Sequence, residues 1–293
     1  MPEPPVFSPE LAEATRQRLR ELLGSTWERI QAEDEPLRLA GRPDRERHLL
    51  AILDQRAEEF AQEYRELRLP GHLGDFLAYR AAVEIFDRSH RDEIFREVVP
   101  TLANRGDFRH AMLTLGLADH VRSYTKYPVR LPIRNPAGGR VVDLIIGEGA
   151  TIEIETKSSN KFDGPLRHVR YTDAFNGIRI AWNRALGGEN PQLTGVRPNA
   201  LLVGGVTVEV ASLPTIVRAA KNWLERKGAD HPNFWGILVL TYQATTVLPA
   251  GRSFGDGQPL TFNSYAGVQL RAAQNRYYTG SAQIILTPSV VGH

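Results

Sequence analysis

The stretch that decides the fold is residues 139–159, "GRVVDLIIGEGATIEIETKSS", where two short apolar segments flank a Gly-Glu-Gly-Ala turn. Alternating apolar and polar residues are typical of β-strands, and glycines between two such runs favour a turn. Since residues i and i+2 of a strand share a face, Glu153, Glu155 and Lys157 are expected to project together. Asp143 lies on the preceding strand and is expected opposite or diagonal to them. The stretch therefore predicts a β-hairpin with charges gathered on one face.

That charged face suggests a particular chemistry. Neighbouring carboxylates repel each other, and a divalent cation, a proton or a lysine relieves the repulsion. Hard oxygen ligands beside an ammonium suit Mg²⁺ chemistry on phosphates. Lysine is scarce in this chain, with 5 lysines against 31 arginines, yet one stands at Lys157. A compact ammonium suits a water-activating role better than a guanidinium does. The alternative interpretation is a solvated strand face with a cross-strand Glu–Lys salt bridge.

The rest of the chain predicts a mixed α/β fold with a central mixed β-sheet, a β-meander and flanking helices. Helical periodicity is expected over 9–25, 44–71, 74–90 and 105–124, then 170–188 and 213–228. Asp44 is the expected cap of the second helix, and Pro70-Gly71 its stop. Strands are expected over 127–135, 140–147, 150–159, 199–210 and 233–248. The segment "AQIILTP" near the end of the chain is strand-like, but the sequence does not indicate where it would lie in the sheet.

Asp143, a gap of eleven residues and Glu155-Thr156-Lys157 on a hairpin resemble the PD-(D/E)xK signature of restriction-endonuclease-like nucleases. Val142 stands at the proline position, which varies in that family. The family's core order of helix, three-stranded meander, helix and strand is readable in 106–210, about a third of the chain.

The resemblance implies a role for each matching residue. Asp143 and Glu155 would bind Mg²⁺ or Mn²⁺ together with the backbone carbonyl of Thr156, and Lys157 would hold the attacking water. Glu153 is a candidate for a second metal ligand or an outer group. Glu84 is the candidate for a further acidic ligand from a helix. Asp107 and Asp119 are the acidic residues of the helix nearest the meander.

Basic residues after the motif favour contact with phosphates, namely Lys161, Arg167 and Arg170, with His168 among them. An ordinary basic loop is the alternative. Residues 1–120 carry 17 basic and 23 acidic residues, whereas residues 121–293 carry 19 and 11. The second part is therefore expected to face a polyanion, unless an acidic helical layer simply neutralises it.

Several classes are disfavoured by what the sequence lacks. The chain has no cysteine, which excludes disulfides, thiolate metal sites and cysteine nucleophiles and fits a cytoplasmic protein. No long apolar run or signal-peptide pattern is present, so no membrane contact is expected. Histidine spacing typical of zinc sites, a phosphate-binding loop and a Gly-x-Ser-x-Gly motif are also missing.

Residues 1–105 are expected to form a helical region for recognition, assembly or partner binding. Residues 106–293 are expected to form the nuclease-like domain with a β-rich C-terminal extension. The function that follows is a metal-dependent DNA endonuclease, in bacterial restriction, defence or repair, with a homodimer as a compatible arrangement. Two alternatives stay open: a catalytically inactive nucleic-acid-binding or scaffold protein with this fold, and an RNA-directed nuclease.

Overall fold

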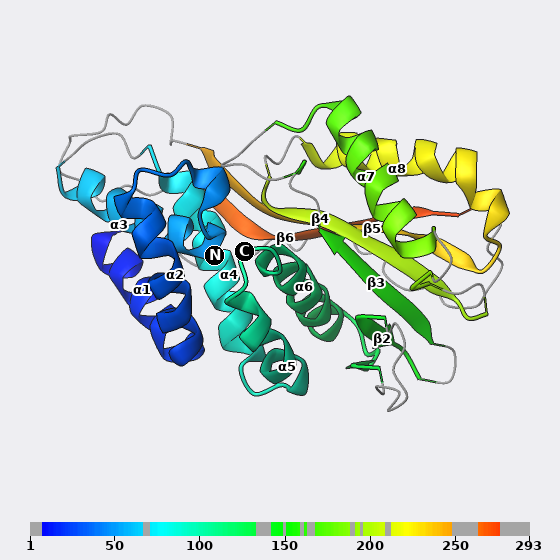
Figure 1. Cartoon of the computed structure of the whole chain (residues 1–293), viewed down its shortest axis with the longest axis horizontal. Helices are drawn as coiled ribbons and strands as arrows, with labels where there is room; N and C mark the ends of the chain where they lie inside the picture. Colours follow the sequence, from blue (N-terminus) through cyan, green and yellow to red (C-terminus); the bar gives the residue numbers. More distant parts are fainter. Residues whose placement is uncertain are drawn as a thin grey trace. The chain divides into compact units, whose positions relative to one another are not determined.

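A computed structural model of the chain is shown in Figure 1. It describes residues 8–66, 71–132, 142–148, 151–158, 161–162, 168–187, 191–193, 196–208, 212–247 and 263–275. These residues fall into two compact units. The first comprises the residues before Met112 together with 242–247 and 263–267, and the second comprises 112–241 and 268–275. Separate folding of residues 1–105 and 106–293 stays a prediction.

The first unit is built from helices that pack on one another. They are α1 (Pro9–Leu23), α2 (Ser25–Leu39), α3 (Leu49–Arg65), α4 (Leu73–Ser89) and α5 (Glu93–Leu102). Ser8 caps α1 by accepting the N–H of Leu11 at 3.2 Å. Helices α1, α3 and α4 pack against each other, and α2 contacts α5. The helices expected over 9–25, 44–71 and 74–90 are present as α1, α3 and α4, and the role of residues 1–105 stays a prediction.

The structure corrects the sequence interpretation of this unit in three places. Helices α2 and α5 were not expected, because α2 contains Pro36 and α5 contains Pro100. Asp44 does not cap α3, since it begins a short 3₁₀ helix, Asp44–Glu46. The cap of α3 is His48, whose Nδ1 accepts the N–H of Leu50 at 3.2 Å. Helix α3 ends at Arg65, and Pro70 lies outside the described residues.

The second unit contains a mixed sheet with helices. Its elements are α6 (Phe108–Tyr124, which begins in the first unit), β1 (Val129–Arg130), β2 (Leu144–Ile146), β3 (Ile152–Ser158), α7 (Tyr171–Leu186), β4 (Asn199–Val208), α8 (Leu213–Lys227), β5 (Phe234–Val247) and β6 (Asn263–Gln274). The described strands lie in the order β1-β2-β3-β4-β5-β6. The predicted mixed α/β architecture is confirmed. The "AQIILTP" segment and the end of the first expected strand lie outside the described residues.

Strand directions explain how the sheet changes from meander to crossover connections. β1, β2 and β3 run antiparallel, as the turn signals predict, and β3 pairs with β4 in parallel through α7. β5 runs parallel to β4, because Asn199 bonds Asn233 and Gly204 lies beside Leu240. A Cβ at Gly204 would lie 1.7 Å from the Leu240 carbonyl oxygen, so only glycine allows these two backbones to approach so closely.

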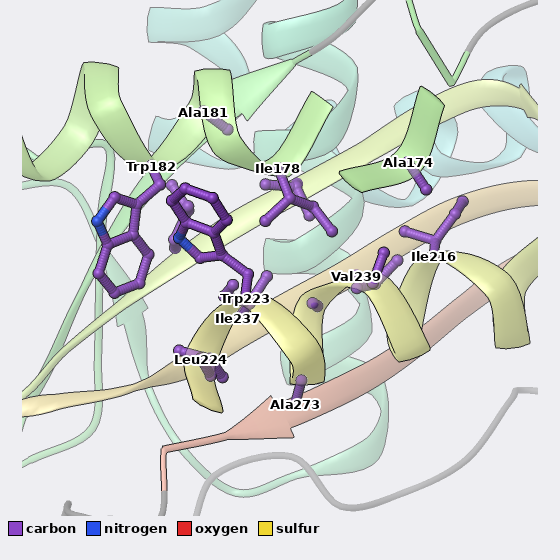
Figure 2. Packing of buried hydrophobic residues seen from close by; sticks show 14 of the residues in the cluster. Ala174, Ile178, Ala181, Trp182, Ile216, Trp223, Leu224, Ile237, Val239 and Ala273 are labelled. Carbon is purple, nitrogen blue, oxygen red and sulfur yellow. The ribbon is translucent and has the colours of Figure 1, made fainter. Parts of the chain in front are cut away.

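Helices α7 and α8 cover one face of the sheet, and Figure 2 shows their apolar side chains directed at β5 and β6. Trp182 of α7 stacks edge-on against Phe234, with ring centroids 4.8 Å apart, and lies 6.2 Å from Trp223 of α8. Helix α6 covers the opposite face, where Leu113 lies against the backbone of β4 at Gly204. The sheet of this unit is therefore buried on both sides. None of the described helices is long and apolar enough to cross a bilayer.

Candidate active site

Strand β3 carries the candidate motif and is buried along most of its length. Ile152 and Ile154 are 1% exposed, and both Glu155 and Thr156 are fully buried. Glu155 pairs in register with Leu201 of β4, and Lys157 pairs with Val203. Because Leu201 and Val203 belong to the cluster beneath α7 and α8, Glu155 and Lys157 face that same layer.

Glu155 and Lys157 form an ion pair within the strand. The Lys157 ammonium donates to Oε1 of Glu155. The Lys157 side chain is 16% exposed and the Glu155 side chain is not exposed at all, so the lysine connects the buried carboxylate to the outside. The alternative interpretation of a solvated strand face is wrong for Glu155, which is fully buried, and its Glu–Lys salt bridge lies within β3 rather than across two strands.

Asp143 directly precedes Leu144, the first residue of β2. The register pairs Leu144 with Ile154, and one further step would place Asp143 opposite Glu155. The Asp143 N–H instead donates to the carbonyl of Ile154 at 2.9 Å, so the backbone pairing slips at this point. Oδ2 of Asp143 accepts the N–H of Thr156 at 2.7 Å, in the position that a backbone carbonyl would take in a longer β2. The carboxylate therefore lies directly beside the Glu155-Thr156-Lys157 motif.

Thr156 is oriented from both sides of the strand. Its hydroxyl faces α6, where Thr114 donates to it at 3.3 Å. Its N–H points towards Asp143 at the β2 edge, and the N–H and C=O groups of one strand residue point to the same neighbour. The Thr156 carbonyl is therefore directed to the edge at which Asp143 lies.

This arrangement is suited to a hard cation. Asp143, Glu155 and the Thr156 carbonyl supply oxygen donors of the kind that Mg²⁺ and Mn²⁺ prefer. Oδ2 of Asp143 accepts the Thr156 N–H, and Glu155 directly precedes Thr156 on β3. A buried carboxylate in an apolar layer also gains from a neighbouring positive charge. Within the described ranges, no cluster of three or more His, Asp or Glu side chains is arranged to hold a metal ion. The candidate site thus offers two carboxylates and one backbone carbonyl. These oxygen donors are of the type that would bind the implied Mg²⁺ or Mn²⁺.

The further acidic candidates lie in other surroundings. Glu153 accepts from Arg197 at 3.2 Å, which directs its carboxylate to an exposed guanidinium. Glu84 belongs to α4 of the first unit, where it accepts from Arg80 at 2.8 Å. Asp107, at the start of α6, accepts from Asn104.

Asp119 is buried on α6 beside His120. Burial lowers the pKa of the His120 imidazole, while the neighbouring Asp119 carboxylate acts in the opposite direction. Its two ring nitrogens have no hydrogen-bond partner among the described residues. Because α6 covers the face that Thr156 contacts, these two residues belong to the layer opposite Glu155 and Lys157.

The expected phosphate contacts lie near the start of α7. Lys161, His168 and Arg170 are exposed, and Arg170 directly precedes the first turn of α7. Arg167 lies outside the described residues. The exposed positions are compatible with contacts to a bound polyanion.

Two arginines, Arg130 in β1 and Arg197 shortly before β4, were not among the predicted site residues. Arg197 reaches Glu153, and Arg130 of β1 pairs with Ile145, which in turn pairs with Glu153. Arg130 therefore projects from the same face as Glu155 and Lys157. The alternation of buried Val129 and exposed Arg130 indicates that they lie on opposite faces of a strand. Which face of the sheet Arg130 takes could be assigned only from the β1–β2 register.

Comparisons of the chain with models of known protein families, with curated proteins and with solved structures find no match in any of the three.

Proposed function

We propose that this protein is a metal-dependent phosphodiesterase of the PD-(D/E)xK type that cleaves DNA. The observation that carries the proposal is the bond from the Thr156 N–H to the Asp143 carboxylate, which brings an aspartate to a strand bearing a buried glutamate and a lysine. The order of α6, the β1–β3 meander, α7 and β4 supports the resemblance on which the proposal rests. Bacterial restriction, defence or repair is the setting that we propose with it.

The residues have distinct roles in this proposal. Asp143, Glu155 and the Thr156 carbonyl would hold Mg²⁺ or Mn²⁺, which supplies charge stabilisation and a more acidic bound water when present. Lys157 keeps its ammonium between the buried Glu155 and the solvent, where it can orient the attacking water and donate to a phosphate oxygen. The apolar layer around Glu155 excludes bulk water from one side of the site and so strengthens these interactions.

DNA is the proposed substrate because the second part of the chain is basic. Residues 121–293 hold 19 basic against 11 acidic residues. Lys161 and Arg170, which follow β3 in the sequence, are exposed and would contact phosphates. An RNA target uses the same phosphate chemistry, so the assay below includes RNA.

A second candidate function is supported by the same ion pair. In the second candidate, the Glu155–Lys157 pair has one role, which is to neutralise a buried carboxylate. The protein would then be a nuclease fold that binds nucleic acid without cutting it. The two candidates differ in their response to Lys157→Arg, because a salt bridge tolerates a guanidinium and a water-orienting ammonium does not.

The experiment measures cleavage of plasmid DNA, linear DNA and RNA with Mg²⁺ or Mn²⁺. We expect Asp143→Asn, Glu155→Gln and Lys157→Arg each to lower the cleavage rate by at least about 100-fold, as for removal of one group that stabilises transition-state charge. Glu225→Gln, an exposed carboxylate on α8, is the matched control and should cleave like wild type. Mn²⁺ titration followed by calorimetry should show weaker binding for Asp143→Asn and nearly unchanged binding for Lys157→Arg.

Wild-type cleavage by both Glu155→Gln and Lys157→Arg would overturn the catalytic proposal. So would a wild-type protein that binds no Mn²⁺ and cuts none of the three substrates. Binding of nucleic acid without any cutting would support the second candidate.

A further inference from the structure

The segment between α6 and β1 combines exposed aromatic and basic side chains. Residues 122–130, "RSYTKYPVR", contain three basic residues and no acidic one. Arg122, Lys126 and Arg130 are exposed, and Tyr124 and Tyr127 are 49% and 43% exposed. In the described part of the chain, five large apolar or aromatic residues are exposed: Leu39, Tyr124, Tyr127, Ile180 and Val196. Only the two tyrosines among them are close in sequence and flanked by cations on both sides.

Hydrogen bonds fix this segment at both ends. The Thr125 N–H and hydroxyl both donate to the Val121 carbonyl, at 2.9 and 2.6 Å, and the Tyr127 N–H donates to the Thr125 hydroxyl at 3.1 Å. The Pro128 carbonyl accepts the N–H of Gly147 at 2.9 Å, which ties the segment to β2. The tyrosines are thus presented by an ordered turn, and little conformational entropy is lost when a ligand stacks on them.

Tyr124 is also supported from beneath. Its ring lies 5.0 Å from the buried ring of His120, at an interplanar angle of 38°. The tyrosine ring is thereby held against its own helix, while about half of the residue remains exposed. This is the geometry of a platform on which a flat ligand can stack.

The segment and the candidate active site share the sheet of the second unit. Val129 pairs with Ile146, which pairs with Ile152, and Lys157 stands five positions further along β3. Standard strand dimensions put this end of the segment roughly 20 Å from Lys157. That distance corresponds to about six steps of a stacked nucleic-acid strand. Arg130 lies between the two, on the face of Glu155 and Lys157.

We infer that residues 122–130 bind a single-stranded stretch of the nucleic acid, with Tyr124 and Tyr127 stacking on unpaired bases and Arg122, Lys126 and Arg130 contacting phosphates. The inference rests on the proposed function, since it assigns the part of the substrate that leads to the site. A duplex would use the cations but not the tyrosines, because its bases are already stacked on each other. An acidic peptide would likewise leave the two exposed rings unexplained, whereas every base offers a flat face to an aromatic side chain.

The test is binding of fluorescently labelled oligo-dT and of a duplex of equal length, measured by anisotropy in EDTA. We expect Tyr124→Ala and Tyr127→Ala each to weaken oligo-dT binding about 5- to 100-fold and to leave duplex binding unchanged. Tyr124→Phe and Tyr127→Phe should bind like wild type, because phenylalanine keeps the stacking face. Ile180→Ala, an exposed apolar residue on α7, is the matched control without an effect.

Lys126→Ala separates the phosphate contacts from the stacking. It should weaken binding of both oligo-dT and the duplex. The slope of log affinity against log salt concentration should fall by about one neutralised phosphate, whereas the tyrosine variants should keep the wild-type slope. A melting curve for each variant confirms that the turn remains folded.

The outcomes distinguish this inference from the proposed function. Wild-type oligo-dT affinity in the Tyr124→Ala/Tyr127→Ala double variant would overturn the inference, even if the protein cleaves DNA. Equal losses for duplex, or displacement of oligo-dT by poly-glutamate at equal charge concentration, would show a plain polyanion surface and also overturn it. Tyrosine-dependent oligo-dT binding without metal-dependent cleavage would support the inference and refute the proposed catalysis.

Discussion

Two buried carboxylates in the two units are held in different ways. Asp54 of α3 is 4% exposed and accepts two bonds from Arg16 of α1, both at 3.2 Å, and one from Tyr79 of α4 at 2.8 Å. Glu155 of β3 is fully buried and pairs with Lys157, two residues along the same strand. Asp54 connects three helices through its partners, whereas Glu155 and Lys157 both lie on β3, so their ion pair connects no two elements.

The difference indicates which buried charge serves the fold and which serves the chemistry. A guanidinium binds a carboxylate with two parallel bonds and never loses its charge, which suits a fixed connection between helices. Burial and the nearby Asp54 charge raise the pKa of Tyr79 strongly, so its hydroxyl stays a donor. Lysine is a mobile point charge with a single head group, and it occurs nowhere in residues 1–120, where all 17 basic residues are arginine. Strand β3, which carries Glu155, is one of the places in the later part of the chain where a lysine is used instead.

The largest effect on stability is expected for Asp54→Ala. Removing this carboxylate leaves the Arg16 guanidinium, with its side chain 11% exposed, without its buried partner. We expect the free energy of unfolding to fall by about 3–5 kcal/mol, measured by urea denaturation. Glu58→Ala is the matched control, because Glu58 contacts the same arginine at 3.0 Å but is 63% exposed. That variant should lose less than about 1 kcal/mol. Equal losses in both variants would contradict the structural role assigned to Asp54.

A much smaller change in stability is expected for Glu155→Gln. The substitution keeps the side-chain volume and removes a carboxylate whose burial is costly, and the partly exposed Lys157 can turn towards solvent. We expect the free energy of unfolding to change by about 1 kcal/mol or less, while cleavage is lost. Urea denaturation alongside the cleavage assay tests both parts. A loss as large as that of Asp54→Ala would make Glu155 a structural charge and would remove the contrast between the two units.

The smallest effect is a pH dependence that is specific to the first unit. His48 accepts the Leu50 N–H through Nδ1 and bonds the Leu102 carbonyl through Nε2, which requires the neutral ring with its proton on Nε2. Burial lowers its pKa, against the opposite influence of the Leu102 carbonyl and the charges of Asp34 and Glu33; Arg109 adds to the lowering. A folded-state pKa below the unfolded value means that the unfolded chain binds the proton first.

Stability is therefore expected to be lost as pH falls through about 6.5 and below, the range of an unperturbed histidine. His48→Asn keeps a helix-capping side chain but does not titrate, so its stability should depend less on pH over this range. Denaturation midpoints between about pH 5 and 8 provide the measurement. His120 remains in the variant and is also buried with a lowered pKa, so part of the dependence should persist. Identical pH profiles for variant and wild type would show that His48 is not a source of the effect.

Much of the fold could be predicted because its elements carry their own periodic signals. The amphipathic pattern of α7 and α8, the turn at Gly147 and the apolar runs of β4 and β5 are all local in the sequence. Gly147 indeed has a positive φ of 103°, the conformation that its turn requires. Helices α2 and α5 were missed because a proline in each one obscures the helical period. His48 was missed as a cap because histidine is not among the usual capping residues.

The sequence by itself determined that Glu153, Glu155 and Lys157 share one face of a strand, since alternation follows from backbone geometry alone. Only the tertiary structure decided what that face is. The layer of α7 and α8 buries Glu155 and leaves Lys157 partly exposed, which alternation does not reveal. Because β2 begins only at Leu144, the Thr156 N–H is free to bond the Asp143 side chain, and the length and register of a strand depend on pairing between segments. The spacing of the charges was therefore set locally, while their burial and their partners came from packing across the sheet.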